Sequence, residues 1–298
     1  MSNNTELVIP VAFATDTNYI VPTIVAVKSL IDHCSNSLNY ILYLLTEEEL
    51  NKRTLKIFRS LIKEKHNIKI VYLTVGKLIE NVQLCTNGPT KGISKVTYYR
   101  FLLPELITGF DKVLYLDTDI IIRKDISSIF VTNIDEYYVA GVHDIVGYQI
   151  EEERCKELNI NSLDSYVNAG VLLLNLKKIR EDKKNIELLK VAKERSFPYN
   201  DQDIINSILF GHIKMLPYNC NVIVDYLKSQ SFYEALRIDY HEVTNNPIII
   251  HYAGKSKPWY SRKNLYADFW WSIVDSISSF SFYIEIIKFR RLIRKRFK

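Results

Sequence analysis

The sequence predicts an α/β protein in which a mixed, mainly parallel β-sheet is flanked by helices. Strand-like runs alternate with segments whose apolar residues recur at helical spacing through the first half of the chain. The 298 residues are enough for a well-buried core. The chain is 47% hydrophobic and 24% charged, as ordinary globular proteins are, so it is neither disordered nor fibrous.

The first half alternates strands and helices most clearly. "LVIPVAFATD" (7–16) predicts a buried strand that ends in a polar turn. "YIVPTIVAVKSLIDH" (19–33) predicts a helix that tolerates Pro22 in its first turn. Next we expect a strand, an amphipathic helix with acids first and basic residues late, and another strand. They span 38–46, 47–65 and 68–74.

The later part of the chain continues the pattern after a break. Residues 75–96 have little hydrophobic period and several Gly, Asn and Thr, which is typical of a mobile loop. Strands are expected at 112–122, 137–144, 169–176 and 247–254, and helices at 177–194 and 203–210. Because no repeat or composition break precedes residue 265, we expect one domain over 1–265 and a C-terminal helical region over 266–298.

The net charge of +5 is concentrated in a basic tail. Residues 281–298 carry seven Lys/Arg and one Glu, a net +6, which leaves about −1 for residues 1–280 and no case for nucleic-acid binding. Two interpretations fit the tail: a basic amphipathic helix on an anionic membrane surface, or a C-terminal helix that docks on the body or frays. Its apolar residues at helical spacing are Phe282, Ile286, Phe289, Ile293 and Phe297.

The cysteines and the apolar runs bear on the cellular compartment. Cys34, Cys85, Cys155 and Cys220 form no C-x-x-C pair, which suits a reducing compartment. No secretory signal is visible, and no run approaches the ~18–20 apolar residues of a membrane span. We expect a cytoplasmic protein, soluble or peripheral on the inner face of the membrane.

Several common catalytic motifs are missing. No G-x-G-x-x-G follows the first strand, and no phosphate-binding P-loop, G-x-S-x-G elbow or H-E-x-x-H helix occurs. With only nine glycines in the chain, Rossmann dinucleotide binding and P-loop chemistry are disfavoured. Attention therefore falls on polar clusters at strand ends, where open α/β sheets place their ligands.

The first cluster is an acidic pair inside an apolar stretch. Asp117 and Asp119 flank Thr118, between "VLYL" and "III". Burying both carboxylates is costly unless a basic side chain, a helix N-terminus or a metal ion neutralises them. Residues i and i+2 of an extended segment share one side, so a divalent ion is an economical solution. Turn acids or a helix cap are equally consistent with a lone D-x-D.

The second cluster follows the run "IIIHYAGKSKPW" (248–259). His251 would add imidazole to the two carboxylates, giving an N/O site that suits Mn²⁺ better than Ca²⁺. Lys255 and Lys257, beside Gly254, suit a diphosphate. The competing interpretation is a structural histidine followed by a solvated basic turn.

Two further clusters are polar. In "FATDTNY", Asp16, Asn18 and Tyr19 suit recognition of a nucleotide base or, equally, an Asx-type turn that caps the next helix. The second joins "YVNAG" to "YNDQD", where a first-turn position in a helix is the alternative for the acids. Its polar members are Asn168, Asp201, Gln202 and Asp203.

Taken together and in order, six segments over roughly residues 8–260 resemble the family 8 glycosyltransferases, which include bacterial lipooligosaccharide α-galactosyltransferases and glycogenin. The segments are "FATDTNYIVPTIVAVKSL", "TYYRFLLPEL", "DKVLYLDTDIIIRKDI", "NAGVLLLNLKK", "DQDIIN" and "HYAGKSKPW". The resemblance implies a GT-A fold with a Rossmann-like nucleotide-sugar domain.

The resemblance also implies an activity. Family members transfer a hexose, here from UDP-galactose or UDP-glucose, with retention of the α configuration. They use Mn²⁺, for which Mg²⁺ substitutes. The acceptor would be a lipid-linked, lipopolysaccharide or protein-linked glycan.

Residue by residue, the resemblance assigns roles to this chain. Asp117, Asp119 and His251 match the metal ligands. Gly254 and Lys257 match the diphosphate contacts. The other matching positions bind uridine (Ala14, Asp16, Asn18, Tyr19), contact the donor (Arg100, Thr118) or surround the donor sugar (Asp144, Asn168, Ala169, Asp201, Gln202).

Gln202, Asp201 and Asp144 are the catalytic candidates. The amide of Gln202, at the position relevant to retention, is a poor nucleophile. This favours a front-face route in which the departing phosphate oxygen acts as the base. Gln202 then has a stabilising role.

One departure from the family pattern stands out, because Lys255 replaces a proline after the turn glycine. It adds a phosphate contact or changes the stiffness of the loop. Asp125 falls outside the site and is expected to cap the "ISSIF" turn.

Two alternatives remain. One is a catalytically silent protein of the same fold that binds UDP or a glycan. The other is a nucleotidyltransferase, which the missing Gly-rich loop disfavours.

Overall fold

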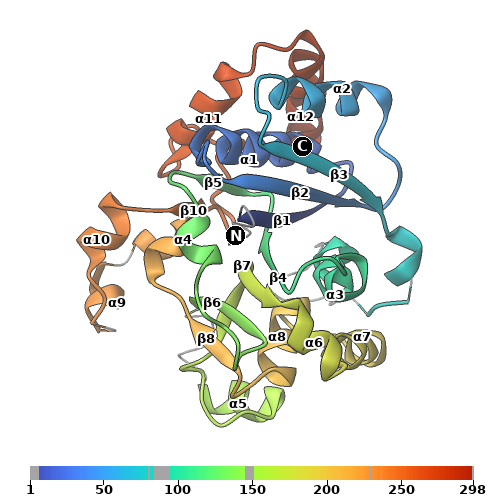
Figure 1. Ribbon diagram of the computed structural model, residues 1–298. Helices are drawn as coiled ribbons and strands as arrows, with labels where there is room; N and C mark the ends of the chain where they lie inside the picture. Colours follow the sequence, from blue (N-terminus) through green and yellow to red (C-terminus); the bar gives the residue numbers. More distant parts are fainter. Residues whose placement is uncertain are drawn as a thin grey trace, which may run out of the picture.

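The computed structural model describes residues 7–79, 81–83, 94–144, 151–228, 230–235 and 237–296 (Figure 1). Half of the loop expected at 75–96, together with Cys85, Phe297 and Lys298, lies outside these described residues. The expected α/β class is confirmed, with a large seven-stranded sheet beside a small three-stranded one.

The large sheet is mostly parallel. Its order is β3-β2-β1-β4-β7-β6-β8, with only β7 antiparallel to its neighbours β4 and β6. The small sheet has the order β5-β10-β9. The strands are β1 (Val8–Thr15), β2 (Asn39–Thr46), β3 (Ile68–Thr74), β4 (Lys112–Leu116), β5 (Ile120–Ile122), β6 (Val139–His143), β7 (Val167–Asn175), β8 (Ile213–Met215), β9 (Val222–Ile223) and β10 (Ile249–His251).

The single strand expected at 112–122 is wrong, because the chain leaves the large sheet in its middle. β4 ends at Leu116, and β5 begins at Ile120 in the small sheet. Asp117 still donates its N–H to the Gly170 carbonyl at 2.7 Å, whereas the Asp119 carbonyl accepts from Tyr252 N–H at 2.9 Å. The acidic pair therefore sits where the two sheets meet.

Helices cover both faces of the large sheet, and each face buries its own apolar core (Figure 1). On one face lie α1 (Ile20–His33), α2 (Lys52–Leu61), α11 (Ala267–Ser276) and α12 (Phe280–Arg296). On the other lie η2 (Lys95–Leu102), α3 (Leu103–Leu106), α6 (Leu176–Glu181), α7 (Lys184–Glu194) and α8 (Asn200–Ile208). The remaining helical turns are η1 (Gly76–Ile79), α4 (Ser127–Phe130), α5 (Glu151–Leu158), η4 (Tyr218–Cys220), η5 (Val224–Lys228), α9 (Gln230–Ala235) and α10 (Tyr240–Asn245).

Three helix predictions need correction at their boundaries. The helix expected at 47–65 begins only after Asn51, whose side chain accepts the Thr54 N–H at 3.0 Å. The helix expected at 177–194 breaks into α6 and α7 around Lys183, which has φ 55°. α8 begins three residues earlier than expected, and this places Asp201 and Gln202 in its first turn.

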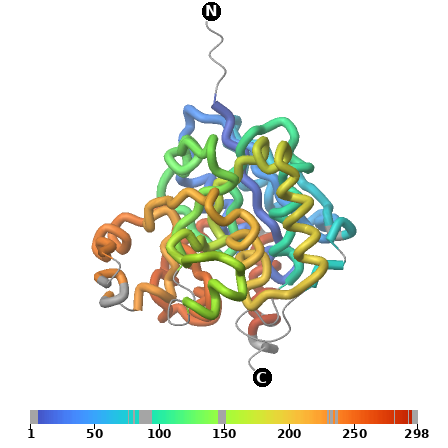
Figure 2. Tube along the Cα trace, turned by 90° about the horizontal axis from the view of Figure 1, so that it is seen from below, coloured from blue at the N-terminus to red at the C-terminus, as the bar shows by residue number. Residues whose placement is uncertain are grey.

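The C-terminal helices belong to the body. α12 buries Phe282, Ile286 and Phe289 in the core that α1 and α11 also line. Of the two interpretations of the tail, the docked helix is therefore the one observed for residues 280–296. α9 and α10 project from one side of the molecule in both views (Figure 1 and Figure 2). Within the described ranges, no helix combines the length and apolar character needed to cross a bilayer.

Candidate active site

The junction of the two sheets brings the acidic pair against the histidine that ends β10. One ligand atom from each of Asp117, Asp119 and His251 lies within 4.8 Å of the others. His251 Nε2 is 3.2 Å from Asp119 Oδ1 and 3.8 Å from Asp117 Oδ2. The register of β10 with β5 pairs His251 with Ile120, directly after the acidic turn. The three residues expected to form a metal site thus converge, from segments about 130 positions apart.

Two basic side chains balance the acidic pair. Arg100, on η2 and 4% exposed, places Nη2 3.0 Å from Asp117 Oδ1 and its guanidinium 4.2 Å from the Tyr115 ring. Lys257 forms an ion pair with Asp119 and donates to the Tyr252 carbonyl at 2.6 Å. Burial alone would raise the pKa of Asp119, but Lys257 and His251 hold it below its ordinary value. Asp119 therefore stays ionised at neutral pH.

The same three ligands fit a divalent metal. Two carboxylates and one imidazole within reach of a single ion form the N/O set that Mn²⁺ accepts, and the set contains no soft sulfur ligand. Arg100 and Lys257 already pair with the two carboxylates, so a bound ion would share Asp117 and Asp119 with them.

Gly170 allows the histidine and the acidic pair to approach one another. A methyl group on Gly170 would overlap the His251 ring and lie 2.9 Å from Asp117 Oδ2. The Gly170 carbonyl also holds the Asp117 N–H. Gly170 belongs to the "NAG" segment, but the sequence pattern gives it no role in the site, since the close approach arises only from the pairing of strands.

A second cluster of buried polar groups adjoins the metal ligands. Gln202 Oε1 accepts from Ala169 N–H at 3.0 Å and Asn168 Nδ2 at 3.2 Å. Gln202 Nε2 donates to Asp144 Oδ2 at 3.0 Å and to the Tyr166 hydroxyl at 3.2 Å. Both lone pairs and both protons of this amide are therefore engaged by the protein, which fixes its orientation.

Asp144 is held by three donors. Asn168 and Gln202 donate to its Oδ2, and the Tyr226 hydroxyl donates to its Oδ1 at 2.6 Å. Tyr166 in turn donates to Asp203 Oδ1 at 2.6 Å. Sequence reasoning missed both tyrosines: Tyr166 lies two residues before Asn168, whereas Tyr226 lies in η5 without any local signal.

Asp201 faces the metal side of the site instead of joining Asp144 and Gln202. Its Oδ2 is 3.0 Å from Arg100 Nε, and the side chain is 7% exposed. Burial raises the pKa of Asp201 to about 6, although Arg100 partly offsets this effect. Of the three catalytic candidates, only Asp144 and Gln202 share a cluster.

The turn expected to bind uridine closes β1, just beyond Ala14. Asp16 Oδ1 accepts the backbone N–H of Asn18 at 2.8 Å and of Tyr19 at 3.1 Å, so the Asx-turn interpretation holds for this carboxylate. The Tyr19 ring packs edge-on against Trp259, with centroids 5.9 Å apart. Burial raises the pKa of Tyr19 to about 12. An aromatic pair therefore lies beside Lys257.

The turn after His251 shows what replaces the family's proline. Gly254 has φ +90°, and a Cβ there would overlap Asp225. Asp225 Oδ2 accepts the Lys255 N–H at 3.0 Å, a bond that a proline could not make. The side chain of Lys255 is exposed. With Lys255 in place of proline, the turn lacks the stiff proline ring and is held instead by the hydrogen bond to Asp225.

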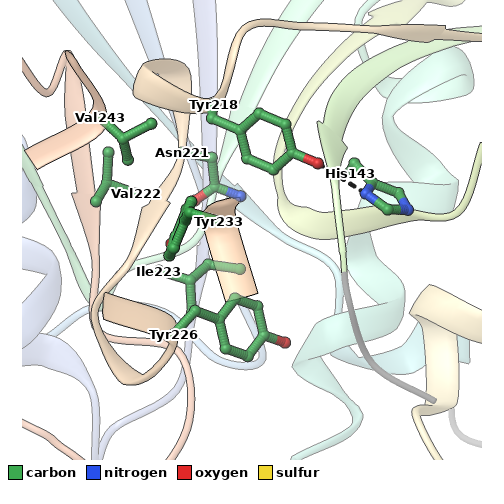
Figure 3. A pocket seen from close by; sticks show the side chains of 8 residues that line it. All are labelled: His143, Tyr218, Asn221, Val222, Ile223, Tyr226, Tyr233 and Val243. Atoms are coloured by element: carbon green, nitrogen blue, oxygen red, sulfur yellow. Dashed lines mark hydrogen bonds between the residues drawn. The ribbon is translucent and has the colours of Figure 1, made fainter. Parts of the chain in front are cut away.

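A partly open cavity lies beside the second cluster (Figure 3). Its volume is about 10 Å³, which is room for about one water molecule. Figure 3 shows Tyr218 directed toward His143, to which its hydroxyl is hydrogen-bonded at 2.8 Å. The lining residues are His143, Tyr218, Asn221, Val222, Ile223, Tyr226, Tyr233 and Val243. Because Tyr226 also binds Asp144, the cavity adjoins the site.

Known proteins share this architecture. The sequence model of the family described as "Glycosyl transferase family 8" matches residues 10–263. A lipopolysaccharide 1,2-glucosyltransferase of Escherichia coli is 27% identical over 268 residues, covering 85% of this chain and 74% of that protein.

Two solved structures superpose on the fold. The galactosyltransferase LgtC, in complex with donor and acceptor sugar analogues, has a TM-score of 0.72 at 25% identity, over 91% of this chain and 97% of that chain. The bifunctional glycosyltransferase WbbM has a TM-score of 0.81 at 24% identity, over 98% of this chain and 53% of that chain. This chain therefore spans about half of WbbM. The expected GT-A fold is confirmed.

The close approach at Gly170 yields a first prediction. Gly170→Ala should push the His251 ring away from the acidic pair and weaken Mn²⁺ binding about 10- to 100-fold, with the fold retained. Titration with Mn²⁺, followed by electron paramagnetic resonance of the free ion, measures this change. Gly109→Ala is the matched control, because a Cβ there meets nothing within 4 Å. Equal Mn²⁺ affinity in the two variants would contradict the steric argument.

The buried Asp201 carboxyl yields a prediction about pH. Since its pKa in the folded protein is about 6, above the usual value near 3.8, the folded state holds this proton more tightly than the unfolded chain. The protonated Asp201 carboxyl therefore contributes up to about 3 kcal/mol to the free energy of unfolding. This contribution is complete below about pH 4 and is lost as the pH rises through about 6.

Asp201→Asn should abolish this loss. In EDTA, the Tm of the variant should rise relative to the natural protein as pH increases from 4 to 7. Asp135→Asn, at an exposed position, is the control. A Tm difference for Asp201→Asn that does not change with pH would refute the prediction.

Proposed function

Because the chain belongs to glycosyl transferase family 8, we propose that it moves a hexose from a UDP-sugar to a glycan acceptor, forming an α-linkage with retention. The donor is UDP-galactose or UDP-glucose. One observation carries the proposal: two carboxylates and an imidazole converge within 4.8 Å beside a buried cluster of amides and a carboxylate. The first group suits a metal-bound diphosphate and the second suits sugar hydroxyls.

The diphosphate would lie at the junction of the two sheets. Asp117, Asp119 and His251 would hold Mn²⁺, with Mg²⁺ as a substitute, and the bound ion would act as a Lewis acid toward the phosphate oxygens. Lys257, beside Asp119, would supply a charge-assisted contact worth about 1.5–3 kcal/mol. Tyr19 and its neighbour Trp259 would face the uracil, and Asp16 holds the turn that carries Tyr19.

The sugar would lie against Asp144, Asn168 and Gln202. Retention by double displacement needs a nucleophile, but the Gln202 amide is a poor one and all its hydrogen-bonding positions are engaged. Asp144 already accepts three hydrogen bonds, which lower its nucleophilicity. We therefore favour a front-face reaction. The bond from the anomeric carbon to the phosphate oxygen breaks, the acceptor oxygen bonds to the same face, and its proton passes to the departing phosphate.

The acceptor would approach on the side where the tyrosines of Figure 3 lie, next to Asp144, to which Tyr226 donates. Aromatic rings suit the apolar faces of sugar rings. The similarity to a lipopolysaccharide glucosyltransferase supports a cell-surface glycan as the acceptor. A lipid-linked or protein-linked glycan presents the same sugar chemistry.

Turnover of UDP-sugars tests the proposal. With Mn²⁺ the protein should release UDP from UDP-galactose or UDP-glucose, and EDTA should abolish the release. Asp117→Ala and Asp119→Ala should each lower turnover at least about 100-fold while circular dichroism stays unchanged. Asp135→Ala, at an exposed position, should leave turnover as it is.

Three results would count against the proposal. Activity that persists in EDTA would contradict the requirement for a metal ion. Binding of UDP-sugar without any turnover indicates the silent binding protein. A β-anomeric product by NMR, or a glycosyl group trapped on Asp144 or Asp201 and found by mass spectrometry, removes the front-face route.

We further propose that α12 contacts an anionic membrane surface, which would place the enzyme at the inner face of the membrane. The apolar stripe of α12 packs on the body, so contact would rest on its outward side. That side exposes Lys288 and Arg290 together with Tyr283 and Leu292. Each basic residue near such a surface contributes about 1 kcal/mol.

Charge reversal on α12 tests the membrane contact. Lys288→Glu with Arg290→Glu should reduce binding to phosphatidylglycerol vesicles at least about tenfold at low salt. The control pair, Lys156→Glu with Lys190→Glu, reverses two charges that are at least 70% exposed on other helices. Equal sedimentation of the two double variants with vesicles would rule the contact out.

A further inference from the structure

A buried amide links the candidate metal ligand His251 to the backbone of β7. Asn221, 2% exposed, directly precedes β9, whose pairing with β10 brings it beside His251. Its Oδ1 lies 3.0 Å from His251 Nδ1, and its Nδ2 lies 2.9 Å from Asn168 Oδ1. Neither the sequence patterns nor the family resemblance assigns Asn221 a role.

The direction of each hydrogen bond in this chain follows from one backbone group. The Gly170 N–H can only donate, and it lies 3.0 Å from the Asn168 side chain, so the atom that it meets is the oxygen. Asn168 Nδ2 then faces two acceptors, Asp144 Oδ2 and Gln202 Oε1, which agrees with this assignment. The orientation of Asn168 is therefore set at both ends of its amide.

That orientation propagates to the imidazole. Asn168 Oδ1 can only accept, so the Asn221 atom 2.9 Å from it is the nitrogen, and the Asn221 oxygen faces His251. An amide oxygen only accepts, and His251 Nδ1 must carry the proton. In the neutral ring Nε2 then carries the lone pair, whereas the doubly protonated ring would donate from Nε2 to Asp119 Oδ1, 3.2 Å away. Without Asn221, Asp119 would be the nearby acceptor and would draw the proton to Nε2.

We propose that Asn221 is a positioning residue that fixes the His251 tautomer, so that Nε2 presents its lone pair to a divalent metal. A hydrogen-bond acceptor at the other ring nitrogen sets the ring orientation and the basicity of a metal-bound histidine. The inference rests on the metal site of the proposed function, but the tautomer is a property of the protein without metal.

Nitrogen NMR of the imidazole rings tests the proposal in metal-free, ¹⁵N-labelled protein at alkaline pH. His251 should be protonated at Nδ1 in the natural protein. In Asn221→Ala the proton should move to Nε2. Asn221→Asp keeps an acceptor toward Nδ1 and should retain the Nδ1–H form. Asn219→Ala, two residues away in the same turn, is the matched control and should leave the tautomer unchanged.

Mn²⁺ affinity supplies a second measurement. Asn221→Ala should weaken Mn²⁺ binding about 10- to 100-fold, while Asn219→Ala binds as the natural protein does. An Nε2–H tautomer in the natural protein, or an Asn221→Ala variant with unchanged tautomer and Mn²⁺ affinity, would overturn the proposal. Loss of the Nδ1–H form in Asn221→Asp would overturn it as well.

The proposed function can fail separately. A natural protein that holds the Nδ1–H tautomer and binds Mn²⁺, yet turns over no UDP-sugar, contradicts only the enzymatic activity. A natural protein that binds no Mn²⁺ overturns the metal site and this inference together.

Discussion

Two carboxylates at the meeting point of two sheets are the constraint around which the site is organised. Asp117 and Asp119 are tolerated there because Arg100, Lys257 and His251 surround them with donors and positive charge. Each of these partners comes from a different element, so η2, β10 and the turn after β10 are all drawn to one point. The break between β4 and β5 is what exposes both acids to these partners.

Around this centre, buried polar side chains form hydrogen bonds with one another. Gln202, Asn168 and Asp144 form a buried cluster whose donors and acceptors match, and Asn221 extends it to His251. A buried network of this type holds its groups rigidly, because breaking one bond leaves another group unsatisfied. Such preorganised dipoles are what a reaction that separates charge requires.

Local patterns predicted a strand or helix well where the whole segment packs in a single sheet or along a single helix axis. β3 matches the expected 68–74, and Asp125 caps the "ISSIF" turn through the Ser127 N–H at 2.8 Å, as expected. The prediction failed at 112–122, where an apolar pattern interrupted by "DTD" passes between two sheets, and at Lys183, where a left-handed residue splits a helical pattern. Hydrophobic periodicity reports burial, not which sheet or helix axis a residue joins.

The sequence by itself determined the α/β class, the polar clusters at strand ends and the residue types that suit a metal and a diphosphate, because these depend on local spacing and side-chain chemistry. Only the tertiary structure decided that Arg100 and Lys257 share the charge of the acidic pair and that Asp201 lies apart from Gln202. It also decided that Gly170 and Asn221 hold His251. The contacts among these residues join positions 17 to 138 residues apart, and only strand pairing and burial bring them together.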